Sequence, residues 1–501
     1  MAADLLERLH GGGFLRDVDA ALGRTVLRLF PDSDALVGAA AALAARAVAD
    51  GHAALALDAL PQRLAAFAPG RTPPSLPPPE AWRDALRASA AVAATDAPRA
   101  DALLELDAAD RVYLARYARY ERELAADLAA RATAPAIAVD ADAAARLRAR
   151  FLHDGEAADR QALAALLALR GRLAVITGGP GTGKTTTVTR LLALLAEVAL
   201  RDGAALRMRL AAPTGKAAAR LAEAVRAQRA KLALPAAVAA QIPEDAATVH
   251  RLLGAQPGRT RFRHDRARPL DADVVVVDEV SMVDLPLMAK LVAAVPPTAR
   301  LILLGDPDQL AAVEAGDVLG AIADAADAGG YSAAVADLAE RTLGASVPRA
   351  AQPSALADAA VALTHSHRFA AAGGIGRLAA AIRAGDADAA LAALRAHDDA
   401  RLLDVPAREL QPRLLARALD GYAGLLEARS PGEALDAAQH FRVLTALRRG
   451  PAGSLALNHA IEAALKRRAG IAAASIWWPG RLVLIAENSY ALGLYNGDLG
   501  V

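Results

Sequence analysis

The sequence predicts an α/β protein in which a parallel sheet with a phosphate-binding loop follows a mainly helical N-terminal part. Apolar strand-like runs alternate with helical stretches across residues 139–345, which is typical of a parallel sheet covered by helices on both faces. One of these runs leads into a glycine-rich loop at residues 178–185. Residues 1–133 instead show apolar positions at helical spacing, most clearly at Val37–Ala49 and Arg111–Ala130.

Length and composition limit the classes of protein to consider. The 501 residues are enough for about three domains, each with a core of its own. Hydrophobic residues make up 54% and aromatic residues only 3%, so we expect alanine-rich helices. The net charge is +1, so any basic surface for nucleic acid must be local. The absence of cysteine excludes disulfides and thiolate metal sites.

Targeting signals are not evident in the sequence. The first residues lack the basic and apolar regions of a signal peptide. The best membrane candidate, Ala35–Ala45, is too short for a helix that crosses a bilayer, which needs about twenty apolar residues. We therefore expect a cytoplasmic protein without a membrane partner.

The N-terminal part divides at a proline-rich segment, residues 69–79, which reads as a stiff, extended connector. After it, Tyr113, Tyr117 and Tyr120 recur at steps of four and three residues, which predicts one face of a helix. Packing or a partner surface is the expected role of these tyrosines, with stacking on a nucleotide as the alternative.

The glycine-rich loop fits the phosphate-loop pattern of Gly, four residues, then Gly-Lys-Thr, between a strand at Leu173–Thr177 and a helix at Thr186–Val198. Glycines allow the backbone amides to face a triphosphate at the helix N-terminus. Lys184 would reach the β- and γ-phosphates, and the Thr185 hydroxyl would bind Mg²⁺. The alternative is a glycine-rich turn between strand and helix. The loop consists of Gly178, Gly179, Pro180, Gly181, Thr182, Gly183, Lys184 and Thr185.

An acidic pair, Asp278 and Glu279, follows four valines that read as a buried strand. In a phosphate-loop protein, the aspartate there holds Mg²⁺ and the glutamate orients and deprotonates the attacking water. The alternative is a strand-end acidic pair that caps the next helix. Together with the phosphate loop, the pair predicts hydrolysis of a magnesium nucleotide such as ATP.

A third strand, Leu301–Leu304, ends in Gly305, Asp306, Pro307, Asp308 and Gln309. The Gln309 side chain could hydrogen-bond a γ-phosphate and sense its loss, whereas the alternative is a polar turn. Ligands bind beyond the carboxyl ends of the strands of an open parallel sheet, so we expect these polar tips to meet the phosphate loop.

Two further segments complete a series of motifs. Leu210–Ala212 reads as a strand that ends in Pro213, Thr214, Gly215 and Lys216, and a second segment begins at Thr248. The chain has only five lysines, and two of them, Lys184 and Lys216, lie inside the motifs. In a chain that otherwise uses arginine, lysine at these positions indicates sites that need a compact ammonium group, which the planar guanidinium of arginine cannot replace.

The ordered series resembles superfamily-1 helicases of the RecD type from about Gln161 to the end of the chain. Ser366–Phe369 with Gly374–Ala379, and Tyr490–Gly500, agree with this family. The run Tyr113–Tyr117 with Tyr120 and Glu121 resembles, more weakly, the α-chain of the bacterial exodeoxyribonuclease V complex. The resemblance implies two RecA-like P-loop domains, the second incomplete, after the helical part. The implied domains are 1–138 (partner-binding), 139–345 (ATP-binding) and 346–501 (second RecA-like).

The resemblance also assigns site residues and partners. Gln161 would read the adenine edge, and Thr186 would complete the nucleotide-binding set. Arg368 would be an arginine finger that reaches the γ-phosphate from the second RecA-like domain. The implied partners are single-stranded DNA and the other two subunits of the complex, with movement from 5′ to 3′. The residues implied to contact DNA are Pro213, Thr214, Gly215, Lys216, Thr248, His250 and Asn496.

The chain departs from the family near its end. Val501 precedes the inserted β domain and the final motif of the family, and Ile485–Asn488 replaces the usual Thr-Arg-Asn. A fragment of a longer gene product or a non-functional helicase would both account for this. Two other functions stay open, a P-loop ATPase used as a switch or assembly factor and a non-catalytic partner-binding fragment.

Overall fold

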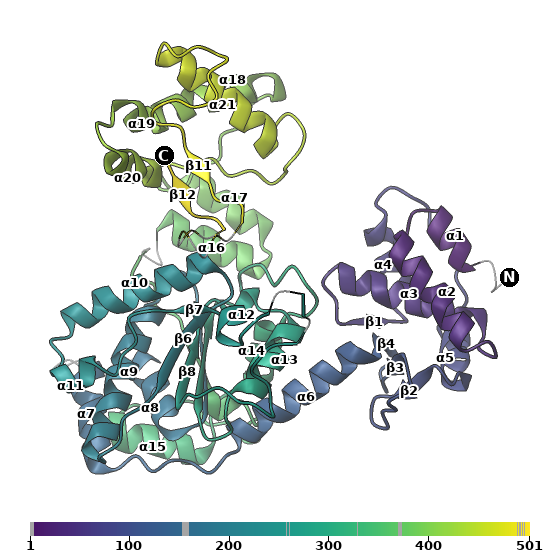
Figure 1. Ribbon diagram of the computed structural model, residues 1–501, viewed down its shortest axis with the longest axis horizontal. Coiled ribbons are helices and arrows are strands. Elements are labelled where there is room, and N and C mark those ends of the chain that lie inside the picture. The colour runs from purple at the N-terminus through teal and green to yellow at the C-terminus, as the bar shows by residue number, and fades with distance from the viewer. Residues whose placement is uncertain are drawn as a thin grey trace. The chain divides into compact units, whose positions relative to one another are not determined.

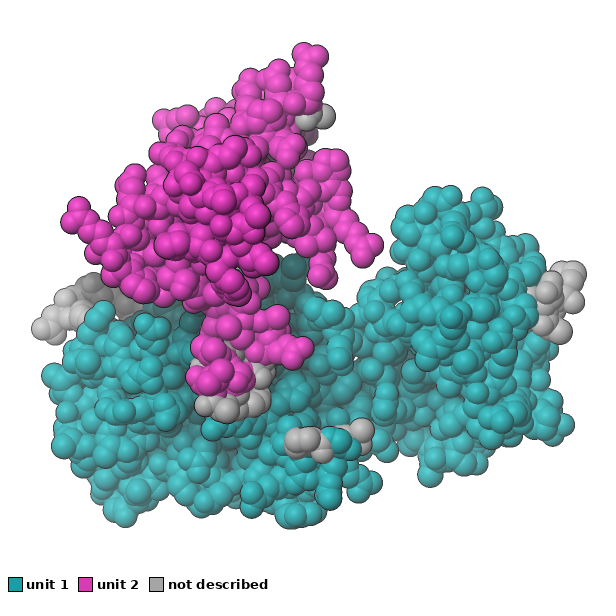
Figure 2. Space-filling view, turned by 45° about the horizontal axis from the view of Figure 1, so that its top comes forward, with its two compact units in different colours: residues 1–368 teal, residues 369–501 magenta. Residues whose placement is uncertain are grey.

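A computed structural model (Figure 1) describes residues 5–152, 160–256, 258–259, 261–327, 329–368, 373–487, 489, 492, 494 and 496–501. The chain divides into two compact units, residues 1–368 and 369–501, which are coloured separately in Figure 2. None of the helices described is long and apolar enough to cross a bilayer.

The N-terminal part of the first unit is mainly helical. Its core surrounds the alanine-rich α3, which begins where the Asp34 side chain accepts a hydrogen bond from the backbone N–H of Leu36 at 2.8 Å. The helices are α1 (Leu5–Gly11), α2 (Asp17–Leu29), α3 (Ala35–Ala49), α4 (Leu60–Phe67) and α5 (Pro79–Ala88). A four-stranded sheet of order β1-β4-β3-β2 completes it, with β1 (Ala54–Ala56), β2 (Val92–Ala94), β3 (Leu104–Leu106) and β4 (Arg111–Leu114).

The helix predicted from Arg111 begins four residues later, as α6 (Ala115–Ala132). Residues 111–114 instead form β4, because Val112 and Tyr113 are buried between β1 and β3. Tyr113 therefore lies on a strand, and the prediction that Tyr113, Tyr117 and Tyr120 share one helix face is wrong. Only the last two lie on α6, with their rings 6.4 Å apart.

The main sheet, as we call the larger sheet of the first unit, is wholly parallel and has the order β10-β5-β9-β8-β6-β7. This confirms the parallel sheet that the sequence predicts. The strands are β5 (Leu173–Gly178), β6 (Met208–Ala212), β7 (Ala247–Thr248), β8 (Val274–Val277), β9 (Arg300–Gly305) and β10 (Ala360–Leu363).

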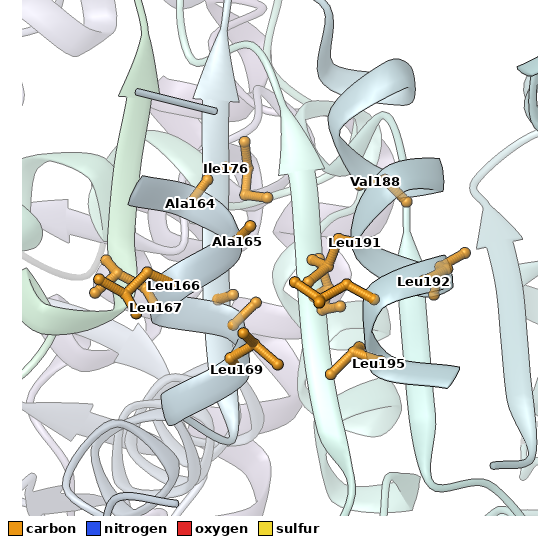
Figure 3. Close-up of a cluster of buried hydrophobic side chains, with 14 of the residues drawn as sticks. Ala164, Ala165, Leu166, Leu167, Leu169, Ile176, Val188, Leu191, Leu192 and Leu195 are labelled. Carbon is orange, nitrogen blue, oxygen red and sulfur yellow. The ribbon is translucent and has the colours of Figure 1, made fainter. Parts of the chain in front are cut away.

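Helices cover both faces of the main sheet, because apolar side chains alternate between the two faces along each strand. Ala174 and Ile176 of β5 enter the core cluster shown in part in Figure 3, whereas Leu173 and Val175 enter the opposite one. The first face packs α7 (Ala141–Phe151), α8 (Arg160–Arg170), α9 (Lys184–Arg201), α10 (Gly215–Lys231), α11 (Ala236–Ala239) and α15 (Ala333–Leu343). The second face packs α6, α12 (Val249–Leu252), η1 (Val280–Met282), α13 (Leu285–Ala294), α14 (Val318–Ala326) and η2 (Ala357–Ala359).

Residues 325–358 are rich in alanine, glycine and proline, which predicts an insertion or linker, but they include the helix α15. The Ser332 side chain caps α15, and Val335, Ala339 and Leu343 are buried in the core on one face of the main sheet. The segment after α15 leads into β10, a strand that lies beyond the predicted domain boundary at residue 345 but in the same sheet as β5. The division into 1–138, 139–345 and 346–501 stays a prediction.

The second unit is mainly helical around a small core of its own. Its elements are α16 (Gly374–Ala384), α17 (Ala387–Ala396), α18 (Ala407–Gly421), α19 (Ala423–Glu427), α20 (Pro431–His440), α21 (Ser454–Arg468), β11 (Val483–Leu484) and β12 (Leu499–Gly500). The apolar run at 443–447 predicts a strand, but none forms, because no neighbouring strand pairs with it among the described residues and Leu444 is exposed. The apolar run at 482–485 also predicts a strand, and of it only β11 forms.

Candidate nucleotide and nucleic-acid site

A cavity of about 860 Å³ gathers most of the predicted nucleotide-binding residues at the carboxyl ends of β5, β8 and β9. It therefore combines residues from segments that lie far apart in the sequence, as the strand tips predict. The predicted residues that line it are Gln161, Pro180, Gly181, Thr182, Gly183, Lys184, Thr185, Thr186, Asp278, Glu279, Gln309 and Arg368.

The loop between β5 and α9 needs glycine for its shape. Gly183 has φ +84°, in the left-handed region, and forms the N-cap of α9. A Cβ atom at Gly183 would lie 2.6 Å from Nε2 of Gln161, so a larger residue would also displace that side chain. Nε2 of Gln161 donates to the backbone oxygen of Thr182 at 3.4 Å. Gln161, which is predicted to contact the adenine edge, thus lies against the phosphate loop.

Lys184 is the first residue of α9, and its ammonium group bends back over the loop. Nζ donates to the backbone oxygens of Gly178 and Gly179, at 3.2 Å in the second case. These two glycines lie behind the cavity lining rather than in it. The carbonyl contacts keep the positive charge at the N-terminus of a helix, where an anion would be favoured.

Asp278 and Glu279 leave the tip of β8 in different environments. Burial raises the pKa of Asp278 to about 6, against smaller opposing effects of the Glu279 N–H, which donates to Oδ1 of Asp278 at 2.9 Å, and of the Lys184 charge. Glu279 has φ +53°, a strained conformation for a residue with a Cβ atom. Strain of this kind is characteristic of functional positions.

Gln309 follows the tip of β9 in a tight turn around the buried Asp306. The backbone N–H of Asp308 and the Nε2 of Gln309 each donate a hydrogen bond to the Asp306 carboxylate, both at 3.1 Å. Gln309 itself is exposed and lines the cavity. Asp306 therefore holds the turn that places Gln309 at the edge of the cavity.

The segment after β10 folds directly onto the phosphate loop. The N–H of His367 donates to the oxygen of Gly181 at 2.8 Å, and the Ser366 hydroxyl donates to the oxygen of Pro180 at 3.2 Å. Gly181 has φ +79°, and a Cβ atom there would lie 2.5 Å from Cβ of Arg368. Arg368 is the last residue of the first unit, and Phe369, the next residue of the predicted motif, lies outside the described residues.

Three further residues line the cavity that the sequence patterns did not single out: Phe151, Arg190 and Arg220. His367, which lies in the motif Ser366–Phe369 but had no predicted role, also lines it. Arg190 lies one helical turn after Thr186 on α9, and its buried Nε has no hydrogen-bond partner in the structure described. Arg220 lies one turn after Lys216 on α10. Helical spacing from the motif residues would have found both arginines, whereas no local pattern marks Phe151.

The residues implied to contact DNA come from two neighbouring strand tips. β6 and β7 pair in parallel with Ala212 opposite Thr248, so Pro213–Lys216 and Thr248–His250 begin side by side. Thr214 and Thr248 cap α10 and α12, accepting backbone N–H groups at 3.2 Å. His250 is exposed, and its ring meets that of Phe262 edge to face at 5.7 Å.

Asn496 lies in the second unit, in the turn that leads to β12, where the N–H of Gly497 donates to the oxygen of Ile485 at 2.8 Å. Asn488, Tyr490, Ala491, Gly493 and Tyr495 of the predicted motifs lie outside the described residues.

The donor set in the cavity suits a magnesium ion. No cluster of three metal-binding side chains occurs among the described residues, but Mg²⁺ commonly uses one or two protein oxygens together with phosphate and water. The Thr185 hydroxyl and the Asp278 carboxylate both line the cavity beside Lys184 and supply two such oxygens.

Comparison with known protein families gives two matches. A family model described as the N-terminal domain of the RecBCD enzyme subunit RecD matches residues 12–113. A model described as an AAA domain matches residues 161–315, which include the phosphate loop, Asp278, Glu279 and Gln309.

Curated relatives extend the match to the whole chain. The RecBCD enzyme subunit RecD of Mycobacterium tuberculosis is 42% identical over 506 residues, which cover 100% of this chain and 79% of the relative. That of Mycolicibacterium smegmatis is 39% identical, over 97% of this chain and 79% of the relative. The ATP-dependent RecD2 DNA helicase of Deinococcus radiodurans is 35% identical over 66% of this chain and 36% of the relative.

Proposed function

Because the chain belongs to the RecD family of RecBCD enzyme subunits, we propose that it is an ATP-driven motor that moves along single-stranded DNA within a helicase–nuclease complex. The cavity carries this proposal, because it brings the phosphate loop, the acidic pair, Gln309 and Arg368 to one place. A protein that only bound partners would not need these groups together.

The first part of the mechanism is nucleotide binding. The Lys184 ammonium would exchange its contacts to the Gly178 and Gly179 carbonyls for the β- and γ-phosphates, which carry more negative charge. Thr185 and Asp278 would hold Mg²⁺, which when bound neutralises charge on the phosphates. Gln161, which lies against Gly183, would read the base.

The second part is hydrolysis. The Glu279 carboxylate would orient a water molecule for in-line attack on the γ-phosphate and accept its proton. Gln309 would hydrogen-bond the γ-phosphate and would lose that contact on hydrolysis. The loss of the contact would change the position of the turn that Asp306 holds. Arg368, held on the loop through His367 and Ser366, would supply positive charge as charge moves in the transition state.

The third part is the DNA track. Lys216 and His250, at adjacent strand tips, would contact the backbone of a single strand, and such contacts are sensitive to salt. Asn496 is proposed to contribute from the second unit. Movement from 5′ to 3′, a cytoplasmic location and assembly with the other two subunits of the exodeoxyribonuclease V complex are further parts of the proposal, and family membership supports them.

The test is ATP hydrolysis by the chain with and without oligothymidylate. We expect DNA to stimulate turnover, and we expect Lys184→Ala to lower the stimulated rate by about a hundredfold, as the loss of one charge-stabilising donor typically does. Lys231→Ala, at the exposed end of α10, is the matched control and should keep the wild-type rate.

Two outcomes would contradict the motor. Turnover that is indifferent to DNA would indicate a switch or assembly ATPase. No turnover under any condition, with the chain folded, would indicate a non-catalytic partner-binding protein.

A further inference from the structure

An arginine-rich loop lies between α12 and β8. We use this name for six described residues: Arg259, Arg261, Phe262, Arg263, Arg266 and Arg268. All five arginines are exposed and lie within ten positions of one another, in a chain whose net charge is only +1. The loop is therefore a local concentration of positive charge. A protein with so small a net charge needs such a local surface to bind nucleic acid.

The positive charge of the loop is mostly uncompensated. Arg266 forms a two-point ion pair with Asp127 of α6, at 2.7 and 3.1 Å. The guanidinium groups of Arg259, Arg261, Arg263 and Arg268 make no ion pair or side-chain hydrogen bond with any residue that the structure describes. The acid within the loop, Asp265, accepts backbone N–H groups of residues 267 and 268 at 3.0 and 2.9 Å. Four exposed guanidiniums are thus available to a polyanion.

The loop is held in position by its one aromatic residue. The half-buried Phe262 ring lies 5.4 Å from Nζ of Lys290 on α13 and 5.7 Å from the ring of His250 on α12. Lys290 also lies 5.8 Å from the Tyr120 ring of α6, so one ammonium joins two aromatic rings. The N–H of Arg263 donates to the oxygen of Gly254 at 3.1 Å. An anchored loop loses less entropy when it binds a ligand.

The position of the anchor indicates which polyanion the loop meets. Phe262 contacts His250, and His250 follows the tip of β7 directly, beside Pro213–Lys216 at the tip of β6. A strand that passes over these tips reaches the arginine-rich loop next. Guanidinium groups match phosphate oxygens in geometry and charge, without regard to base sequence.

We propose that the arginine-rich loop binds phosphates of the same single DNA strand that contacts His250, and so lengthens the DNA track beyond the motif residues. This inference rests on the proposed function, because it assumes that a single strand lies along the tips of β6 and β7. Phe262 and Lys290 act as positioning residues for the loop.

The experiment measures binding of fluorescent oligothymidylate by anisotropy over a range of salt concentrations. In the double variant Arg259→Ser with Arg261→Ser, the slope of log affinity against log salt should become shallower by about 1.4, since each phosphate contact on a single strand contributes about 0.7. Arg259→Lys with Arg261→Lys keeps both charges and should restore the wild-type slope.

The matched control is Arg28→Ser with Arg341→Ser, which removes two exposed arginines from α2 and α15. It should leave the slope unchanged. If the serine variant of the loop behaves like this control while the wild type binds DNA, the inference is wrong and the proposed function stands. If the wild type does not bind oligothymidylate, the proposed function itself fails. A slope change seen with blunt duplex DNA and not with oligothymidylate would also overturn the assignment to a single strand.

Discussion

The structure shows that the environment of Asp278 changes the pKa of its carboxyl group. Asp278 is half-buried at the tip of β8, and the desolvation of its carboxyl raises its pKa from the usual 3.8 to about 6. In the nucleotide-free chain the shift favours the neutral form. The stability that Asp278 contributes is therefore full below pH 3.8 and is lost as the pH rises through about 6. A magnesium ion at the carboxylate would reverse this preference.

We predict that protons compete with the magnesium nucleotide at Asp278. The affinity for Mg·ADP should fall as the pH is lowered from 7.5 to 5.5, because the carboxyl with its pKa of about 6 becomes protonated. Isothermal titration calorimetry would measure this dependence. In Asp278→Asn the affinity should be lower but nearly independent of pH over this range. Asp245→Asn, at a side chain that is 99% exposed, serves as control and should keep the wild-type pH profile.

At the scale of elements, α6 is joined to α13 by one buried arginine. Arg131 is only 7% exposed, and its guanidinium donates to carbonyl oxygens at the end of α13 and in the turn beyond it. The distances are 2.5 Å to Val295, 3.2 Å to Pro296 and 3.3 Å to Ala299. Burial lowers the pKa of Arg131, but the carbonyls and the negative end of the helix dipole support the charge. α13 follows Asp278 and Glu279 in the chain. The contacts of Arg131 therefore stabilise the position of the helix that comes after the acidic pair.

We predict that Arg131→Leu lowers the stability of the first unit by about 3 kcal/mol, because several buried carbonyl oxygens lose their donors. Urea unfolding followed by circular dichroism would measure the change. Arg119→Leu, on the exposed face of the same helix with a weak pair to Glu123 at 4.0 Å, should cost less than about 0.5 kcal/mol. Equal effects of the two substitutions would show that the carbonyl contacts of Arg131 do not matter.

At the scale of the whole molecule, the chain consists of two compact units with separate hydrophobic cores. The residues that line the nucleotide cavity all belong to the first unit, since the last of them, Arg368, is its final residue. We therefore expect nucleotide to stabilise the first unit.

We predict two thermal unfolding transitions in differential scanning calorimetry. Mg·ADP at a hundred times its dissociation constant should stabilise the transition of the first unit by about 2.7 kcal/mol and leave the other in place. Lys184→Ala should remove this shift. A single transition that moves as a whole with nucleotide would contradict the independence of the two units.

Much of the fold and of the cavity could be predicted from local patterns. The phosphate loop, the acidic pair after four valines and the Gln309 turn each end a buried run, and parallel strands bring such ends to one edge of a sheet. The family resemblance was likewise carried by short motifs. These features could be predicted because each depends on neighbours in the sequence.

The wrong predictions share a cause, which is that a strand exists only where another strand pairs with it. Residues 111–114 fit a helical pattern, yet β1 and β3 hold them as a strand. Residues 443–447 fit a strand, yet no pairing forms among the residues described. Pairing partners lie far away in the sequence, so periodicity could not decide either case.

The sequence by itself determined which residues are candidates to hold phosphate and magnesium in the first unit, and which predicted strands carry them. Only the tertiary structure decided that Phe151, Arg190 and His367 share the cavity, and that the segment before Arg368 hydrogen-bonds the phosphate loop. The physical reason is one of range. Glycine conformations and apolar runs act over a few residues, whereas the cavity wall is made by packing between helices and loops as far apart in the sequence as Phe151 and Arg368.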